Sequence, residues 1–183
     1  ETPTTNRDKM SELRDFCKNE LGKGIVNCND TPGFIGNRIG VYAMQVAMYE
    51  ALERGLPVEI ADALFGRPLG IPKTGVFGLY DLIGIDLMKD VLASFKKELQ
   101  ENDPFMDVVK PHPLVEQLLE KGFNGNKGPG GFYQTTIVEG DEHVKAMNTS
   151  DMSYYDFDKV DLEIARRVEK EGIKALLDDD SEY

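Results

Sequence analysis

The chain has 183 residues, of which 40% are hydrophobic, and this is enough to bury one main core. Its 33 acidic and 21 basic side chains give a formal net charge of -12, which argues against nucleic acid and anionic membranes as partners because like charges repel. No apolar stretch approaches the ~20 residues needed to cross a bilayer, and no targeting pattern is visible, so we expect a soluble, cytoplasmic protein.

The first thirty residues predict one helix followed by one strand. Apolar residues recur on one face over residues 8–21, which indicates an amphipathic helix that Gly22 ends. The short apolar run at 25–28 is typical of a buried parallel strand. One helix and one strand cannot make a sheet, so we expect residues 1–29 to be the remaining edge of a larger sheet. We interpret both chain ends as cut points within a longer protein.

The two cysteines, Cys17 and Cys28, are eleven positions apart, a spacing that matches neither a zinc ligand pair nor a redox CxxC motif. We predict that both are reduced, buried thiols with a structural role.

A long helix is expected over residues 34–54. Asp30 and Thr31 offer a helix cap, and Pro32 suits a first helical turn. The apolar residues of this helix surround nearly its whole circumference, so its own domain or a second subunit must cover it on all sides. Periodicity and breakers predict four further helices, at 58–65, 76–83, 86–100 (capped by Asp86) and from Pro113 to about residue 121.

The hydrophobic period changes after a glycine-rich loop at residues 124–131. Four glycines in eight residues indicate positive φ angles or a close approach to another group. A phosphate-binding loop is the weaker interpretation, because this loop precedes a strand and not a helix. Beyond it the pattern predicts strands at 132–138, 142–147 and 154–157, and a last helix at 158–177 that Gly172 weakens.

Few side chains offer catalytic or ligand-binding chemistry. His112 and His143 have no nucleophile or carboxylate partner in a matching pattern, so we interpret both as exposed and structural. The acidic residues show no calcium-loop spacing, and no GxGxxG fingerprint occurs, so the chain itself predicts no metal and no cofactor site. Asn37 lies at the start of the long helix, where its amide either orients an oxygen-bearing ligand or is simply exposed or internally paired.

Three segments, in order, resemble 3-hydroxyacyl-CoA dehydrogenases. The run DTPGFIGNRI at 30–39 resembles the family's domain junction. FGLYDLIGID at 77–86 is similar to its PFELLDYVGLD segment, and GPGGFY at 128–133 to its GKKTGEGFY ending. Residues 8–28 also resemble the last helix and strand of the family's NAD-binding domain.

The resemblance implies a mainly α fold in three parts. Residues 1–29 would be the αβ edge of a Rossmann domain, and residues 30–133 a helical domain like the C-terminal domain of 6-phosphogluconate dehydrogenase. Residues 134–183 would be a hairpin and helix that extend towards a following domain, since the continuation is similar to multi-domain fatty acid oxidation proteins.

The resemblance also implies a function. The chain would be the substrate-closing and homodimerisation domain of an NAD-dependent L-3-hydroxyacyl-CoA dehydrogenase of fatty acid β-oxidation, with acyl-CoA as substrate. The family's catalytic His and Glu, and its NAD site, would lie outside this chain, so we expect the chain alone to be inactive. Asn37 matches the active-site asparagine of the family's PGFIxNR motif, which hydrogen-bonds substrate or positions the histidine.

Two alternatives stay open. One is a non-catalytic helical interaction module, and the other is a relative that acts on another 3-hydroxy acid. Lys73 departs from the family's glycine-proline pattern, which places a substrate contact at that position in doubt.

Overall fold

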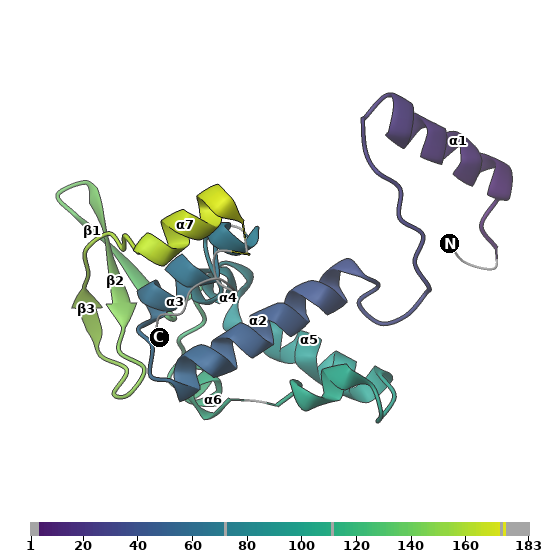
Figure 1. Cartoon of the computed structure of the whole chain (residues 1–183). Coiled ribbons are helices and arrows are strands. Elements are labelled where there is room, and N and C mark those ends of the chain that lie inside the picture. The colour runs from purple at the N-terminus through teal and green to yellow at the C-terminus, as the bar shows by residue number, and fades with distance from the viewer. Residues whose placement is uncertain (1–3, 72, 111, 173, 175–183) are drawn as a thin grey trace. The chain divides into compact units, whose positions relative to one another are not determined.

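The computed structural model describes residues 4–71, 73–110, 112–172 and 174 (Figure 1). The chain divides into two compact units, Glu1–Val41 and Tyr42–Tyr183. No helix among the described residues is long and apolar enough to cross a membrane.

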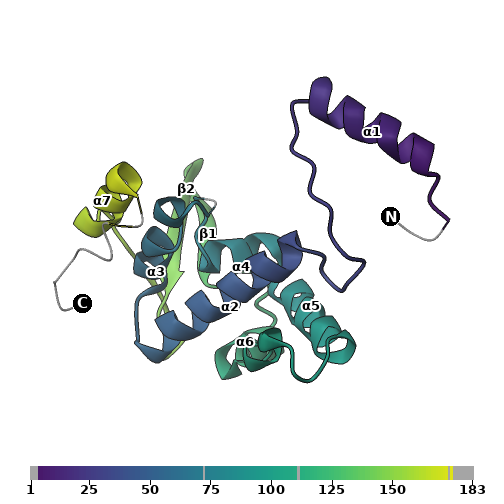
Figure 2. The ribbon, with the colours of Figure 1, turned by 45° about the vertical axis from the view of Figure 1, so that its right-hand side comes forward.

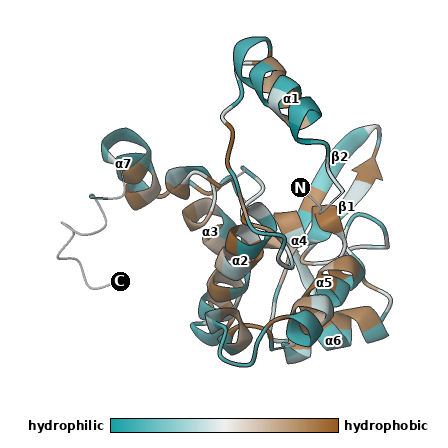
Figure 3. Ribbon diagram, turned by 90° about the vertical axis from the view of Figure 1, so that its right-hand side faces the viewer, coloured by the Kyte–Doolittle hydropathy of each residue, from teal (hydrophilic) through white to brown (hydrophobic). Residues whose placement is uncertain are grey.

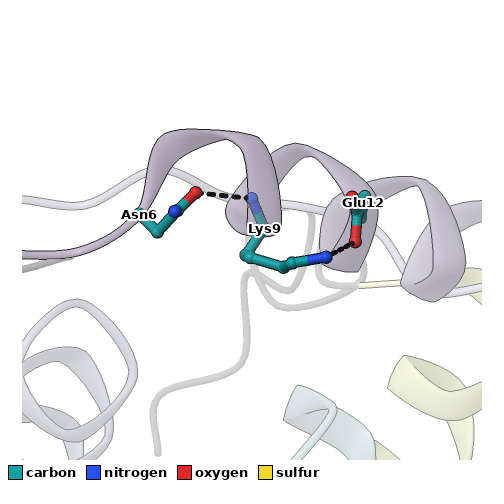
Figure 4. A network of polar contacts seen from close by, with 3 residues as sticks. All are labelled: Asn6, Lys9 and Glu12. Carbon is teal, nitrogen blue, oxygen red and sulfur yellow. Dashed lines mark hydrogen bonds and ion pairs between the residues drawn. The ribbon is translucent and has the colours of Figure 1, made fainter.

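The first unit contains one regular element, α1 (Arg7–Asn19). Its cap is Asn6, whose side-chain oxygen accepts the Lys9 N–H at 3.1 Å, and Lys9 in turn pairs with Glu12 at 2.8 Å (Figure 4). The cap satisfies one of the free N–H groups of the first turn, while the exposed ion pair adds little stability. The predicted helix is therefore confirmed, and it ends before Gly22, which has a φ of 59°.

The predicted strand at 25–28 does not form, and the structure assigns no regular element to these residues. A strand requires a hydrogen-bonded neighbour, and the described residues of this unit provide none. The prediction of buried cysteines is also wrong, because Cys17 is half-buried and Cys28 is exposed, both as free thiols. Much of the apolar face of α1 is exposed too: Leu13 is 52% and Phe16 is 51% accessible. Figure 3 shows brown apolar residues on this otherwise largely hydrophilic helix.

The predicted long helix is α2 (Gly36–Glu53), which contains the boundary between the two units. A tight turn precedes it, in which the Phe34 N–H donates to the Thr31 carbonyl at 2.9 Å and both Gly33 and Phe34 have positive φ angles. Four of its residues in the second unit are buried apolar side chains: Met44, Ala47, Met48 and Ala51.

Short helices build most of the second unit. They are α3 (Val58–Leu64), η1 (Arg67–Leu69), α4 (Phe77–Ile83), α5 (Ile85–Glu98), η2 (Pro104–Asp107) and α6 (Pro113–Glu120). Gly84, with a φ of 104°, separates α4 from α5 and is the N-cap of α5. The prediction that Asp86 is this cap is wrong, because Asp86 lies within the first turn. Figure 2 shows α5 and α6 side by side, and their buried faces contribute to one core.

Side chains from the helices and from the hairpin together form the core of the second unit. Its largest members, each less than 2% exposed, are Met48, Val58, Val76, Phe77, Tyr80, Ile85, Leu118, Phe132 and Met147. Since they come from α2, α3, α4, α5, α6 and the hairpin, the hairpin belongs to the helical unit and is not a separate domain.

The predicted hairpin is confirmed as a three-stranded antiparallel sheet of β1 (Tyr133–Val138), β2 (Asp141–Met147) and β3 (Tyr154–Asp156), in that order. Tyr133 pairs with Ala146, and Lys145 pairs with Asp156. The β1–β2 turn is Glu139-Gly140, and both residues have positive φ, as a two-residue turn matched to strand twist requires.

The last described helix is α7 (Glu163–Glu171), which begins five residues later than predicted because the chain is still extended at its N-cap, Leu162. Gly172, with a φ of 80°, ends it. Residues 175–177 of the predicted helix lie outside the described residues. The mainly helical fold with a small hairpin and a following helix is confirmed.

Candidate functional site

Two carboxylates organise the second unit, and the first is the half-buried Asp62 of α3. Its Oδ1 accepts the Phe77 N–H at 2.7 Å, and its Oδ2 accepts the Gly78 N–H at 2.9 Å. These are two of the N–H groups that the first turn of α4 cannot use within the helix. Asp62 therefore caps α4 from another helix, and a negative charge at this end is stabilised by the helix dipole.

The second carboxylate is Asp81, on the next turn of α4. Its Oδ1 accepts the Phe132 N–H at 3.0 Å, and its Oδ2 accepts the Tyr133 N–H at 2.7 Å, at the point where the glycine-rich loop enters β1. The Tyr133 hydroxyl then donates to Asp62 Oδ2 at 2.9 Å. This closes a ring of contacts from α3 through α4 to the hairpin and back, which we call the carboxylate clamp (Asp62, Asp81 and Tyr133).

The clamp explains why the loop is rich in glycine. A Cβ on Gly131 would lie 2.0 Å from Asp81 Oδ1, and one on Gly125 would lie 2.4 Å from the Asp81 carbonyl oxygen. The expectation of a close approach is therefore confirmed, and the approached group is Asp81. Because Asp81 already accepts the N–H groups of Phe132 and Tyr133, these are not available to cradle a phosphate.

The electrostatics of the clamp follow from burial. Desolvation raises the pKa of Asp62 to about 6 and the pKa of Asp81 to about 7, against the lowering effect of the hydrogen bonds that each accepts. Burial also raises the pKa of the Tyr133 hydroxyl, and the negative charge of Asp62 adds to this effect. Both oxygens of each carboxylate accept hydrogen bonds, so the clamp positions the backbone at the start of α4 and at the entry to β1.

The predicted site residue Asn37 lies in the first unit, in the first turn of α2, and its side chain is exposed. Among the described residues its amide has no hydrogen-bond partner, so an internally paired amide is not what the structure shows. Phe34 and Ile39, on either side of it in sequence, are 56% and 66% exposed. An unpaired amide within exposed apolar surface is suited to contact another molecule or domain.

His112 was predicted to be exposed, but it is half-buried. Its Nδ1 accepts the Leu114 N–H at 3.2 Å and caps α6, and its ring meets the Tyr49 ring edge-on with centroids 5.3 Å apart. Burial lowers the pKa of His112, which favours the neutral ring. A histidine directly before a helix-starting proline is the sequence signal for this cap. His143 is exposed on β2, as predicted.

A cavity lies between α2, α5 and α6, and no sequence pattern predicted it. Its volume is about 210 Å³, and residues from all three helices and from the segment before α6 line it. The reason it was missed is that these residues are distant in sequence and meet only through helix packing.

The described residues hold no group of three or more His, Cys, Asp or Glu side chains that fits a metal ion. They also do not fit a dinucleotide: the first unit offers one helix and an extended segment, with no strand that leads through glycines into a helix.

Comparison with known proteins places these features in a family context. The sequence profile described as "3-hydroxyacyl-CoA dehydrogenase, C-terminal domain" matches residues 33–135, more than half of the chain. A Rickettsia prowazekii protein named as a fatty acid oxidation complex trifunctional enzyme is 36% identical over 159 residues, which are 87% of this chain and 22% of that protein.

Two further relatives agree. The rat protein "hydroxyacyl-coenzyme A dehydrogenase, mitochondrial" is 36% identical over 73% of this chain and 40% of its own length. The crystal structure of FadB2 from M. tuberculosis matches with a TM-score of 0.56 and 26% identity, over 74% of this chain and 46% of that chain. The chain thus spans less than half the length of each of these three proteins.

The clamp predicts that Gly131 tolerates no side chain. Gly131→Ala should lower the free energy of unfolding by at least about 2 kcal/mol, since Asp81 or the loop must move to admit the methyl group. Urea unfolding of the purified chain measures this. The matched control is Gly40→Ala within α2, where an added Cβ meets no atom within 4 Å and stability should rise by up to ~1 kcal/mol. Equal stability of the Gly131 variant and the wild type would contradict the clamp geometry.

The clamp also predicts a pH dependence. Both carboxyl groups have a higher pKa in the folded chain than the ordinary 3.8. Between pH 3.8 and about 7 the folded state therefore binds more protons than the unfolded state. The free energy of unfolding should therefore be highest below about pH 4 as far as these groups contribute, and fall as pH rises to about 7.

Asp81→Asn removes one of the two titrating carboxyl groups. Between about pH 5 and pH 8, the urea unfolding midpoint of this variant should therefore fall less than that of the wild type. The variant should also be less stable at the lower pH by about 1–3 kcal/mol, because its amide NH₂ faces a backbone N–H. Asp90→Asn, an exposed change on α5, is the control and should keep the wild-type slope. An unchanged slope in Asp81→Asn would refute the assignment.

Proposed function

The chain belongs to the 3-hydroxyacyl-CoA dehydrogenase family as its C-terminal domain, and we propose that it is the substrate-closing and dimerisation domain of an NAD-dependent L-3-hydroxyacyl-CoA dehydrogenase. Domains of this kind are part of enzymes of fatty acid oxidation. The observation that carries the proposal is the GFIGNR run at residues 33–38, which lies within the family match and includes Asn37, an exposed amide in the first turn of α2.

Asn37 is the residue that we assign to the reaction. Its amide offers two donors and one acceptor, and it lies where a helix start contributes partial positive charge. It can hydrogen-bond an oxygen of the substrate or orient a catalytic histidine supplied by the rest of the enzyme. It cannot accept a proton or a hydride, so its role is positioning and electrostatic stabilisation.

The proton acceptor and the NAD site belong, on this proposal, to a nucleotide-binding domain that residues 1–29 help to complete. NAD, when bound there, would accept the hydride. The exposed apolar side chains of α1 and the segment after it support this, since they are suited to packing against further sheet: Leu13, Phe16, Leu21, Ile25 and Val26. The described residues do not fit NAD, so we assign no step through it to this chain.

Association is supported by α2. In the second unit, Tyr42 and Val46 remain 41% and 36% exposed on a helix whose other faces are buried. Exposed apolar side chains on an otherwise buried helix are suited to contact with a second copy. Acyl-CoA as substrate and a cytoplasmic location remain predictions of the family assignment.

The chain by itself is predicted to be inactive. The 183-residue chain should neither bind NADH nor consume it in the presence of acetoacetyl-CoA, because on this proposal the groups that hold the cofactor and accept the proton belong to another domain. NADH fluorescence titration and absorbance assays measure the two properties, with a full-length enzyme containing this chain as positive control. Turnover by the chain at a rate comparable to that control would refute the proposal.

A further prediction concerns Asn37 in the full-length enzyme. Asn37→Ala should lower kcat about 10²-fold, the usual effect of removing one transition-state donor, and leave the dimer and the thermal midpoint unchanged. Asn102→Ala, which removes an exposed amide from a loop of the second unit, is the matched control and should keep full activity. Full turnover of the Asn37 variant with loss of the dimer would instead support a non-catalytic interaction module.

A further inference from the structure

The cavity between α2, α5 and α6 has a buried apolar interior. Its walls include Met48, Val109 and Val115, which are 1%, 6% and 8% exposed, together with the ring of Tyr80. Apolar walls of this kind gain nothing from water and favour an apolar guest.

Two of the polar residues that line the cavity, Gln45 and Tyr80, already pair with each other. Gln45 is fully buried, its Nε2 donates to the Val108 carbonyl at 3.0 Å, and its Oε1 accepts the Tyr80 hydroxyl. The His112 Nδ1 accepts the Leu114 N–H, so the proton of the neutral ring is on Nε2. Gln45 and Tyr80 therefore need no polar partner in the cavity, and a hydrocarbon chain can lie against them without leaving either unpaired, while the His112 Nε2–H is the one donor among these groups for which no acceptor has been named.

Charged residues also line the cavity. Lys89 and Lys96 of α5 lie seven residues apart, two turns of one helix face, with Ala93 between them, and Lys110 comes from the segment before α6. Glu116 is the one acidic residue that lines the cavity among the described residues. Three exposed lysines therefore line an otherwise largely apolar cavity on a chain whose net charge is -12.

None of these three lysines forms an ion pair with a described carboxylate. Lysine stems often cover apolar surface with the ammonium in water, and this accounts for one lysine at a cavity rim. Coverage of apolar surface by a lysine stem does not explain why three lysines without ion pairs line the same cavity. Together they produce a local positive potential that attracts an anion.

We propose that this cavity binds a medium-chain carboxylate, with the hydrocarbon tail inside and the carboxylate among Lys89, Lys96 and Lys110. The length of the tail follows from the volume. An apolar cavity of ~150 Å³ accommodates the six carbons of benzene, so about 210 Å³ accommodates roughly eight carbons. Asn37 is not among the residues that line this cavity, and the inference does not depend on the proposed reaction.

Octanoate is the probe, titrated into the 183-residue chain and followed by calorimetry and by chemical-shift changes of the cavity residues. A Kd on the order of 1 mM or tighter is expected for a ligand of this size. Octylammonium has the same tail and the opposite charge, and should bind at least tenfold more weakly. Acetate has the charge without the tail and should show no shifts at the cavity.

Two variants test the two halves of the site. Lys89→Glu with Lys96→Glu should weaken octanoate binding at least tenfold, while Lys97→Glu with Lys121→Glu, the same change in charge away from the cavity, should leave it within about twofold. Ala93→Phe, which fills the mouth with an aromatic ring, should abolish binding without unfolding the chain, as checked by circular dichroism.

Other outcomes overturn the proposal. Equal weakening by both lysine pairs would mean general attraction of the anion, and equal affinity for octanoate and octylammonium would mean that the rim does not recognise charge. Absence of octanoate binding, together with a dimer that Ala93→Phe dissociates in sedimentation experiments, would show that a second copy of the chain covers the cavity instead.

Discussion

The carboxylate clamp is the constraint on which the second unit depends. Asp62 and Asp81 each accept two backbone N–H groups, one pair at the start of α4 and the other where the glycine-rich loop becomes β1. Removal of a carboxylate from water is unfavourable, and these hydrogen bonds offset that cost only because both oxygens of each group are used. A hairpin that is distant in sequence is thereby held against the helices at a defined register.

The clamp also gives a physical role to two of the segments that resemble the family, residues 77–86 and 128–133. The aspartate of the 77–86 segment is Asp81, and the Gly-Phe-Tyr of the 128–133 segment supplies the glycine that lets the loop approach it and the two N–H groups that it binds. Phe132 is fully buried against Phe77, with ring centroids 4.7 Å apart. Two motifs that are separate in sequence therefore form one contact.

The two units differ in how completely they bury their apolar side chains and pair their polar groups. The second unit has a closed core and, among its described residues, no buried side-chain polar atom without a partner. The first unit exposes the apolar face of α1 and an extended segment without strand partners. Since Asn37 lies in this less complete unit, its proposed function depends on surfaces that further protein would cover. The cavity of the second unit is complete within one chain, and this separates the two proposals.

The sequence by itself determined the elements whose signals are local. Periodicity and glycine stops located α1, α2, α3 and α4, and a change of period with turn residues at 139–141 located the hairpin, because these patterns depend on neighbouring residues only. The tertiary structure alone decided three matters. It showed that residues 25–28 form no strand without a partner, that Asp81 is the group the glycine-rich loop approaches, and that three lysines line one largely apolar cavity. Each depends on contacts between residues far apart along the chain, and a single sequence does not encode such distances in any local pattern.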